Sequence, residues 1–125
     1  MRIKQGFLLL SFVLVSLIAL GYGLSPSWFA RRWLGVSTLD ANLSHMLRAV
    51  TGLYLGFGLF WLYAAFDARY RQAALLTVLV FTSGLCAGRI VSYFVDGPAA
   101  PLLQFYLLLE VAIVPVAWWV FRRPD

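Results

Sequence analysis

Four long apolar stretches, separated by short polar segments, dominate the pattern of this 125-residue chain. They cover about residues 7–24, 43–66, 73–94 and 102–121, and each is near the roughly 20 residues that a helix needs to cross a bilayer. A backbone in lipid must satisfy its own hydrogen bonds, so stretches of this kind form helices. The pattern predicts an all-α fold: one integral membrane domain, residues 1–125, arranged as an antiparallel four-helix bundle.

The polar connections predict how these helices are joined. Residues 67–72 (DARYRQ) and 95–101 (VDGPAAP) leave room for tight turns only, which makes their flanking helices antiparallel. The first connection is longer. Its Ser-Pro start, two tryptophans and two arginines over residues 25–35 predict a short helix lying in the membrane interface.

The second spanning helix needs a cap after that segment. Ser37 or Thr38 is predicted to be the cap, with Asp40 in the first helical turn. Aromatic residues, Tyr22 among them, are expected near the interfaces.

Composition agrees with a membrane protein, since 62% of the residues are hydrophobic and only 12% are charged. The ten Lys and Arg residues mostly flank apolar stretches, so they indicate topology and lipid headgroups, and no nucleic acid is expected as a partner. Six basic residues fall on the side of the termini and two on the other side. This asymmetry predicts a bacterial inner-membrane protein with both termini in the cytoplasm. The six are Arg2, Lys4, Arg69, Arg71, Arg122 and Arg123, and the two are Arg31 and Arg32.

Ionisable residues inside the spans are the main candidates for chemistry. His45, Arg48, Arg89 and Glu110 would all lie in the outer half of the bilayer, Glu110 roughly 12 Å deep. A lone Arg or carboxylate in lipid costs about 2.5–3.5 kcal/mol even on a lenient scale, so each should point into the bundle and find a partner. We expect Glu110 to be held by Arg48, by Arg89 or by both.

Helical spacing extends this polar cluster. Ser92 and Asp96 share a stripe with Arg89, and His45 shares one with Arg48. Two GxxxG segments, residues 52–56 and 84–88, are expected to permit close helix packing inside the bundle rather than to form a dimer face.

The pattern predicts no metal site and no cofactor. Cys86 is the only cysteine, lies in an apolar stretch, and has no zinc-type spacing around it. Three functions stay open. The first is a non-enzymatic accessory or scaffold subunit, with the bilayer and a further membrane protein as partners. The second is binding or transport of a small anionic or amphiphilic ligand at the cluster. The third is a membrane enzyme.

Three segments carry a resemblance to a known family: residues 45–62 (HMLRAVTGLYLGFGLFWL), 84–101 (GLCAGRIVSYFVDGPAAP) and 107–111 (LLLEV). With them, the chain resembles an uncharacterised bacterial family of four-helix membrane proteins, a domain of unknown function. The resemblance implies the fold and the membrane location, and no activity. It singles out Gly88, Arg89, Ser92, Asp96 and Gly97, with Arg48 and Glu110.

Overall fold

The computed structural model describes residues 3–35 and 40–124, and every secondary-structure element in these residues is helical. The elements are α1 (Ile3–Gly23), α2 (Pro26–Phe29), the π-helical turn η1 (Ala30–Leu34), α3 (Ala41–Ala65), α4 (Ala68–Asp96) and α5 (Pro101–Arg122). Helices α1, α3, α4 and α5 are each long and apolar enough to cross a membrane. The predicted all-α class and the four long helices are therefore confirmed.

Two helix starts differ from the expectation. Asp40, expected inside the first turn of α3, is its cap instead, because its carboxylate accepts a hydrogen bond from the backbone N–H of Leu43 at 2.8 Å. Ser37 and Thr38 lie outside the described residues. Asp67 likewise caps α4, so α4 begins at Ala68 and runs through most of the segment predicted as a turn.

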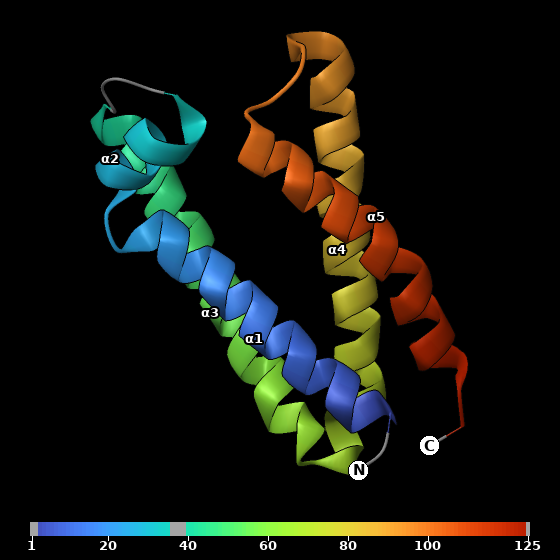
Figure 1. Ribbon diagram of the computed structural model, residues 1–125. Helices are drawn as coiled ribbons and strands as arrows, with labels where there is room; N and C mark the ends of the chain where they lie inside the picture. The colour runs from blue at the N-terminus through green and yellow to red at the C-terminus, as the bar shows by residue number, and fades with distance from the viewer. Residues whose placement is uncertain (1–2, 36–39, 125) are drawn as a thin grey trace.

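The four long helices form two pairs, α1 with α3 and α4 with α5 (Figure 1). Both chain termini lie at one end of the molecule, where the two pairs meet, and the pairs diverge toward the other end. We call the first end the closed end. The second, which carries α2, η1 and the turn between α4 and α5, is the open end.

Close contact between α1 and α3 depends on two glycines. A Cβ atom at Gly23 would lie 2.5 Å from the Thr51 side chain, and one at Gly58 would lie 3.0 Å from a methyl group of Val15. Thr51 uses this proximity to donate a hydrogen bond to the carbonyl of Ala19 at 3.0 Å. The helix pair is therefore held by backbone proximity and one interhelical hydrogen bond.

The glycines of the two GxxxG segments have a different role from the predicted one. Gly52, Gly56, Gly84 and Gly88 are exposed, and a Cβ atom at any of them would meet no other atom within 4 Å. The expectation that they pack helices inside the bundle is wrong. Spacing alone cannot tell which face of a helix is turned inward, and larger side chains such as Tyr54 occupy the inner face of α3.

Polar side chains join the two pairs at the closed end. The Lys4 side chain on α1 is buried, with 6% exposure, and donates to Gln72 Oε1 on α4 at 2.8 Å. Gln72 in turn donates to the carbonyl of Phe121 on α5 at 2.9 Å. One turn above the end of α3, Trp61 Nε1 donates to Thr77 Oγ1 at 2.9 Å. Three helices are thus tied by one lysine and one amide.

At the open end, α2 lies against the first helix pair, and η1, which follows it, touches α5. Phe29 is buried and meets the ring of Tyr22 edge-on, with ring centroids 4.9 Å apart. Tyr22 itself is buried near the end of α1, where its ring packs inward under Phe29. Its expected position near a membrane interface stays a prediction. Outward-facing residues of this segment are Trp28, Arg31, Arg32 and Trp33.

Candidate functional site

Glu110 is held by Arg89. The Nε atom of Arg89 on α4 donates to both carboxylate oxygens of Glu110 on α5, at 3.0 and 3.1 Å. Glu110 is 8% exposed, and the Arg89 side chain is 22% exposed. The ion pair therefore joins the two helices of the second pair and leaves neither charge alone in the interior.

Arg48 and His45 do not join this ion pair. Both side chains are exposed on α3, and neither makes a hydrogen bond or ion pair within residues 3–35 and 40–124. The expectation that Arg48 is buried with Glu110 is wrong. Residues of a helix are about 100° apart, so His45 lies opposite Tyr54, which faces the core. The packing of large aromatic residues decides which face of α3 is inside.

Ser92 and Asp96 bond to each other rather than to the ion pair. The Ser92 hydroxyl donates to Asp96 Oδ2 at 2.7 Å, one helical turn further along α4, and both residues are exposed. Asp96 is therefore no second counter-ion for Arg89. Ser92 stays close to the site, because it lines a pocket that Arg89 also lines.

Three tyrosines surround the ion pair, one each from α1, α3 and α5. Tyr22 of α1 meets Tyr54 of α3 and Tyr106 of α5, with ring centroids 6.2 Å apart in both cases. The Arg89 guanidinium carbon lies 5.8 Å from the centroid of Tyr106. Sequence reasoning missed Tyr22 and Tyr54 as site residues. The available signal was the spacing of Tyr54 with Gly58 and Trp61, which marks one buried stripe of α3.

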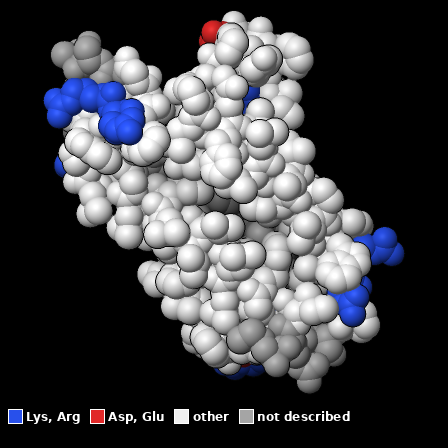
Figure 2. All heavy atoms as spheres, in the orientation of Figure 1, with Lys and Arg blue, Asp and Glu red and all other residues white. Residues whose placement is uncertain are grey.

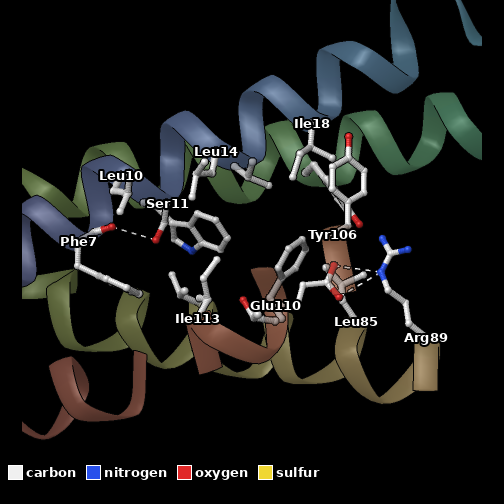
Figure 3. A pocket seen from close by; sticks show the side chains of 16 residues that line it. Phe7, Leu10, Ser11, Leu14, Ile18, Leu85, Arg89, Tyr106, Glu110 and Ile113 are labelled. Carbon is white, nitrogen blue, oxygen red and sulfur yellow. Dashed lines mark hydrogen bonds and ion pairs between the residues drawn. The ribbon is translucent and has the colours of Figure 1, made fainter. Parts of the chain in front are cut away.

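A cavity begins at the ion pair and continues toward the closed end (Figure 3). It holds about 620 Å³ of empty space, part of it open to the outside. Its wall is mostly apolar, and Ser11, which lines it, already donates its hydroxyl to the carbonyl of Phe7. Figure 2 shows the surface hollowed between the two helix pairs in the same view. The lining residues are Phe7, Leu10, Ser11, Leu14, Val15, Ile18, Tyr54, Trp61, Val78, Phe81, Thr82, Leu85, Arg89, Tyr106, Glu110 and Ile113.

A second, more polar pocket adjoins Arg89 on the other side. It contains about 430 Å³ of empty space, again partly open, and lies at the turn between α4 and α5. Arg89 lines both hollows, so the guanidinium separates an apolar space from a polar one. The other lining residues are Ser92, Tyr93, Gly97, Ala99, Leu103, Gln104 and Leu107.

The arrangement suits binding of a molecule with an apolar part. Within the described residues, no group of three or more His, Cys, Asp or Glu side chains is placed to hold a metal ion. The apolar wall provides a place for hydrocarbon, and the ion pair provides an orienting polar contact at one end.

Comparison with known proteins identifies the family. Residues 3–121 match the domain of unknown function DUF4345, and because the match covers nearly the whole chain, the protein belongs to this family. No curated protein and no solved structure matches the chain.

Proposed function

We propose that this DUF4345 protein is a four-span protein of the bacterial inner membrane, arranged as an antiparallel bundle with both termini in the cytoplasm. Four helices of sufficient length and hydrophobicity support the spans. The excess of basic residues on the side of the termini supports the orientation. The exposed Trp28, Arg31, Arg32 and Trp33 support an interfacial position for α2 and η1.

Within the membrane, the proposed function is non-enzymatic binding of an amphiphilic molecule, whose hydrocarbon part enters the cavity between α1 and α5. One observation carries this proposal: a mostly apolar cavity has an ion pair at one end and an opening on the side of the helices. Leu10 is exposed and Leu14 half-buried along the α1 side of that opening, so hydrocarbon would enter directly from the lipid. Uptake of such a molecule is also the first step that transport would require.

Trp61 offers a direct test, because it lines the cavity and is only 2% exposed. A variant that keeps Trp61 and replaces Trp28, Trp33, Trp118 and Trp119 with Phe would be placed in nanodiscs containing brominated lipid. Bromine quenches tryptophan fluorescence at short range. We expect Trp61 to be quenched when a brominated chain occupies the cavity.

A matched pair of substitutions separates occupancy from mere proximity to lipid. Leu14→Phe narrows the opening, whereas Leu17→Phe adds the same ring to the exposed side of α1, where Leu17 lines neither hollow. We expect Leu14→Phe to reduce quenching of Trp61 and Leu17→Phe to leave it unchanged. Equal quenching in both variants would refute binding in the cavity.

A second candidate function is an accessory or scaffold subunit, favoured by the outward face of α3. That face combines two exposed basic side chains, Arg48 and His45, with the open glycines Gly52 and Gly56. An Arg on a lipid-facing surface is costly, and contact with another membrane protein would lower that cost. A photo-crosslinking residue at Ala49 would test this function. A discrete protein adduct that is lost in Arg48→Gln supports it, and adducts with lipid alone refute it.

A further inference from the structure

We infer that the molecule bound in the cavity carries an anionic group, a phosphate or a carboxylate, that binds the terminal Nη atoms of Arg89. This inference rests on the proposed function and names the chemistry of its ligand. It also assigns separate roles to the nitrogen atoms of one guanidinium. The Nε atom binds Glu110, and the two Nη atoms bind the ligand.

The first step concerns the donors that Arg89 still has. A guanidinium has five N–H donors, and Glu110 accepts only from Nε. Figure 3 shows the two Nη atoms turned away from the Glu110 carboxylate. Besides these bonds, the Arg89 side chain hydrogen-bonds to Tyr22 on α1, whose hydroxyl oxygen accepts from the guanidinium. Four of the five N–H donors are on the Nη atoms, so donors remain beside the contact with Tyr22, and a guanidinium matches a carboxylate or phosphate.

The second step concerns where these donors are. Arg89 lines both the apolar cavity and the polar pocket. A ligand can therefore place its hydrocarbon part in the apolar cavity and its polar group at Arg89, beside the polar pocket. Besides Arg89, the polar pocket is lined by Ser92, whose hydroxyl already donates to Asp96, and by Gln104, whose amide donates to the Ala99 carbonyl and keeps one N–H. Leu103, in the first turn of α5, lines it as well, where backbone N–H groups have no partner within the helix. The donors that remain here beside Arg89 are one N–H of the Gln104 amide and backbone N–H groups at the start of α5.

The third step is the sign of the charge. A cationic group would need Glu110, but both carboxylate oxygens already accept from a fixed arginine inside the protein. Asp96 is the other acid nearby, and it is exposed and accepts from Ser92. An anion meets unused donors, whereas a cation would compete with Arg89. The site therefore selects an anionic group.

The experiment uses the Trp61-only protein and two probes with the same chain, a dibrominated fatty acid and its methyl ester, at a pH where the acid is ionised. We expect roughly tenfold tighter binding of the acid, the size of one charge-assisted contact. In the double variant Arg89→Gln/Glu110→Gln, which leaves the interior neutral, the preference should disappear. In Glu110→Gln, which frees Arg89 completely, it should increase. Arg48→Gln is the matched arginine control and should change nothing.

The outcomes separate this inference from the proposed function. Equal binding of acid and ester, with quenching intact, overturns the anionic group and leaves hydrocarbon binding standing. No quenching by either probe refutes the proposed function itself. If the double variant does not fold, an unchanged preference in Glu110→Gln still overturns the inference. Inorganic phosphate identifies the source of the anion: displacement of the acid shows that a free anion binds at Arg89, and no displacement shows that the anion must be attached to a chain.

Discussion

The closed and open ends of this molecule join the same two helix pairs by different interactions. At the closed end, hydrogen bonds cross between the pairs: Lys4 reaches Gln72, and Trp61 reaches Thr77. At the open end, the ion pair of Arg89 and Glu110 stays within the second pair. Contacts between the pairs there are mainly aromatic and apolar, as between Tyr22 and Tyr106, with one polar contact between the Tyr22 hydroxyl and Arg89. The π-helical turn η1 also touches α5.

This difference shows that the buried ion pair does not join the two helix pairs, although its burial suggests that it would. It joins α4 to α5 only. Hydrogen bonds fix both distance and direction, whereas apolar contacts between helices fix neither strongly and compete with contacts to lipid. The pairs are therefore joined at the closed end by the hydrogen bonds of Lys4 and Trp61, and at the open end mainly by aromatic and apolar contacts beside the contact of Tyr22 with Arg89. Under the proposed function, a ligand that enters between α1 and α5 needs only the contacts at the open end to rearrange, and the ion pair has the role of orienting it.

The largest expected effect comes from removing one partner of the ion pair. Arg89→Gln leaves Glu110 charged and unpaired in the interior, which should lower the free energy of unfolding by roughly 3 kcal/mol. Reversible unfolding in mixed micelles would measure it. The double variant Arg89→Gln/Glu110→Gln should recover most of the loss, since no charge remains buried. Arg48→Gln, at an exposed site, should stay within about 0.5 kcal/mol of wild type. A large loss in the double variant would contradict the orienting role.

The closed end should be the next most sensitive. Gln72→Leu removes the acceptor of the buried Lys4 ammonium group and the donor to the Phe121 carbonyl, and we expect a loss of about 2 kcal/mol. Gln104→Leu is the matched control, because Gln104 is exposed like Gln72 but bonds only to the nearby Ala99 carbonyl and not to another helix. Equal effects of the two substitutions would show that the Lys4 network does not fasten the helix pairs.

The same contrast explains how far the sequence could predict the molecule. The four helices follow from length and hydrophobicity, because lipid requires a self-satisfied backbone. The partnership of Glu110 with an arginine follows from the cost of a lone charge, but the choice of Arg89 over Arg48 does not. That choice depends on which face of α3 packs inward, and Tyr54 and Gly58 decide it through their fit to α1 and α4.

Lys4 shows that the surroundings of a flanking charge cannot be predicted either. Its place beside the first apolar stretch made it a topology signal, yet its side chain is buried against Gln72. A flanking lysine that turns inward has the same sequence pattern as one that turns to the headgroups. Only the position of α4 distinguishes them, and that position comes from packing over the whole length of the helices.

Motion of the two ends should differ as well. Spin labels at Met46 and Phe105 would report the open end, and labels at Tyr63 and Trp119 the closed end, each pair in a Cys86→Ala background. All four positions are exposed, so labelling leaves the core intact. We expect a broader distance distribution at the open end, which narrows when brominated fatty acid binds, and no change at the closed end. Distributions of equal width would remove the basis for lateral entry.

The smallest expected effect concerns Asp67, in the turn between α3 and α4 at the closed end. Its hydrogen bond with the Arg69 side chain lowers the pKa of the Asp67 carboxyl to about 2, from about 3.9 in an unfolded chain. A lowered pKa means that the ionised carboxylate favours the folded state. Its contribution is fully present above pH of about 3.9 and is lost as the pH falls through about 2. The difference in thermal midpoint between wild type and Asp67→Asn should therefore stay constant from neutral pH down to that window and shrink within it.

Salt should distinguish the two contacts at the closed end. Because Asp67 and Arg69 meet at the surface, salt should reduce the difference in thermal midpoint at neutral pH, whereas the loss caused by Gln72→Leu should not respond to salt. The opposite result would contradict this assignment: if salt changed the loss caused by Gln72→Leu and not the loss caused by Asp67→Asn, the Asp67 contact would be the buried one.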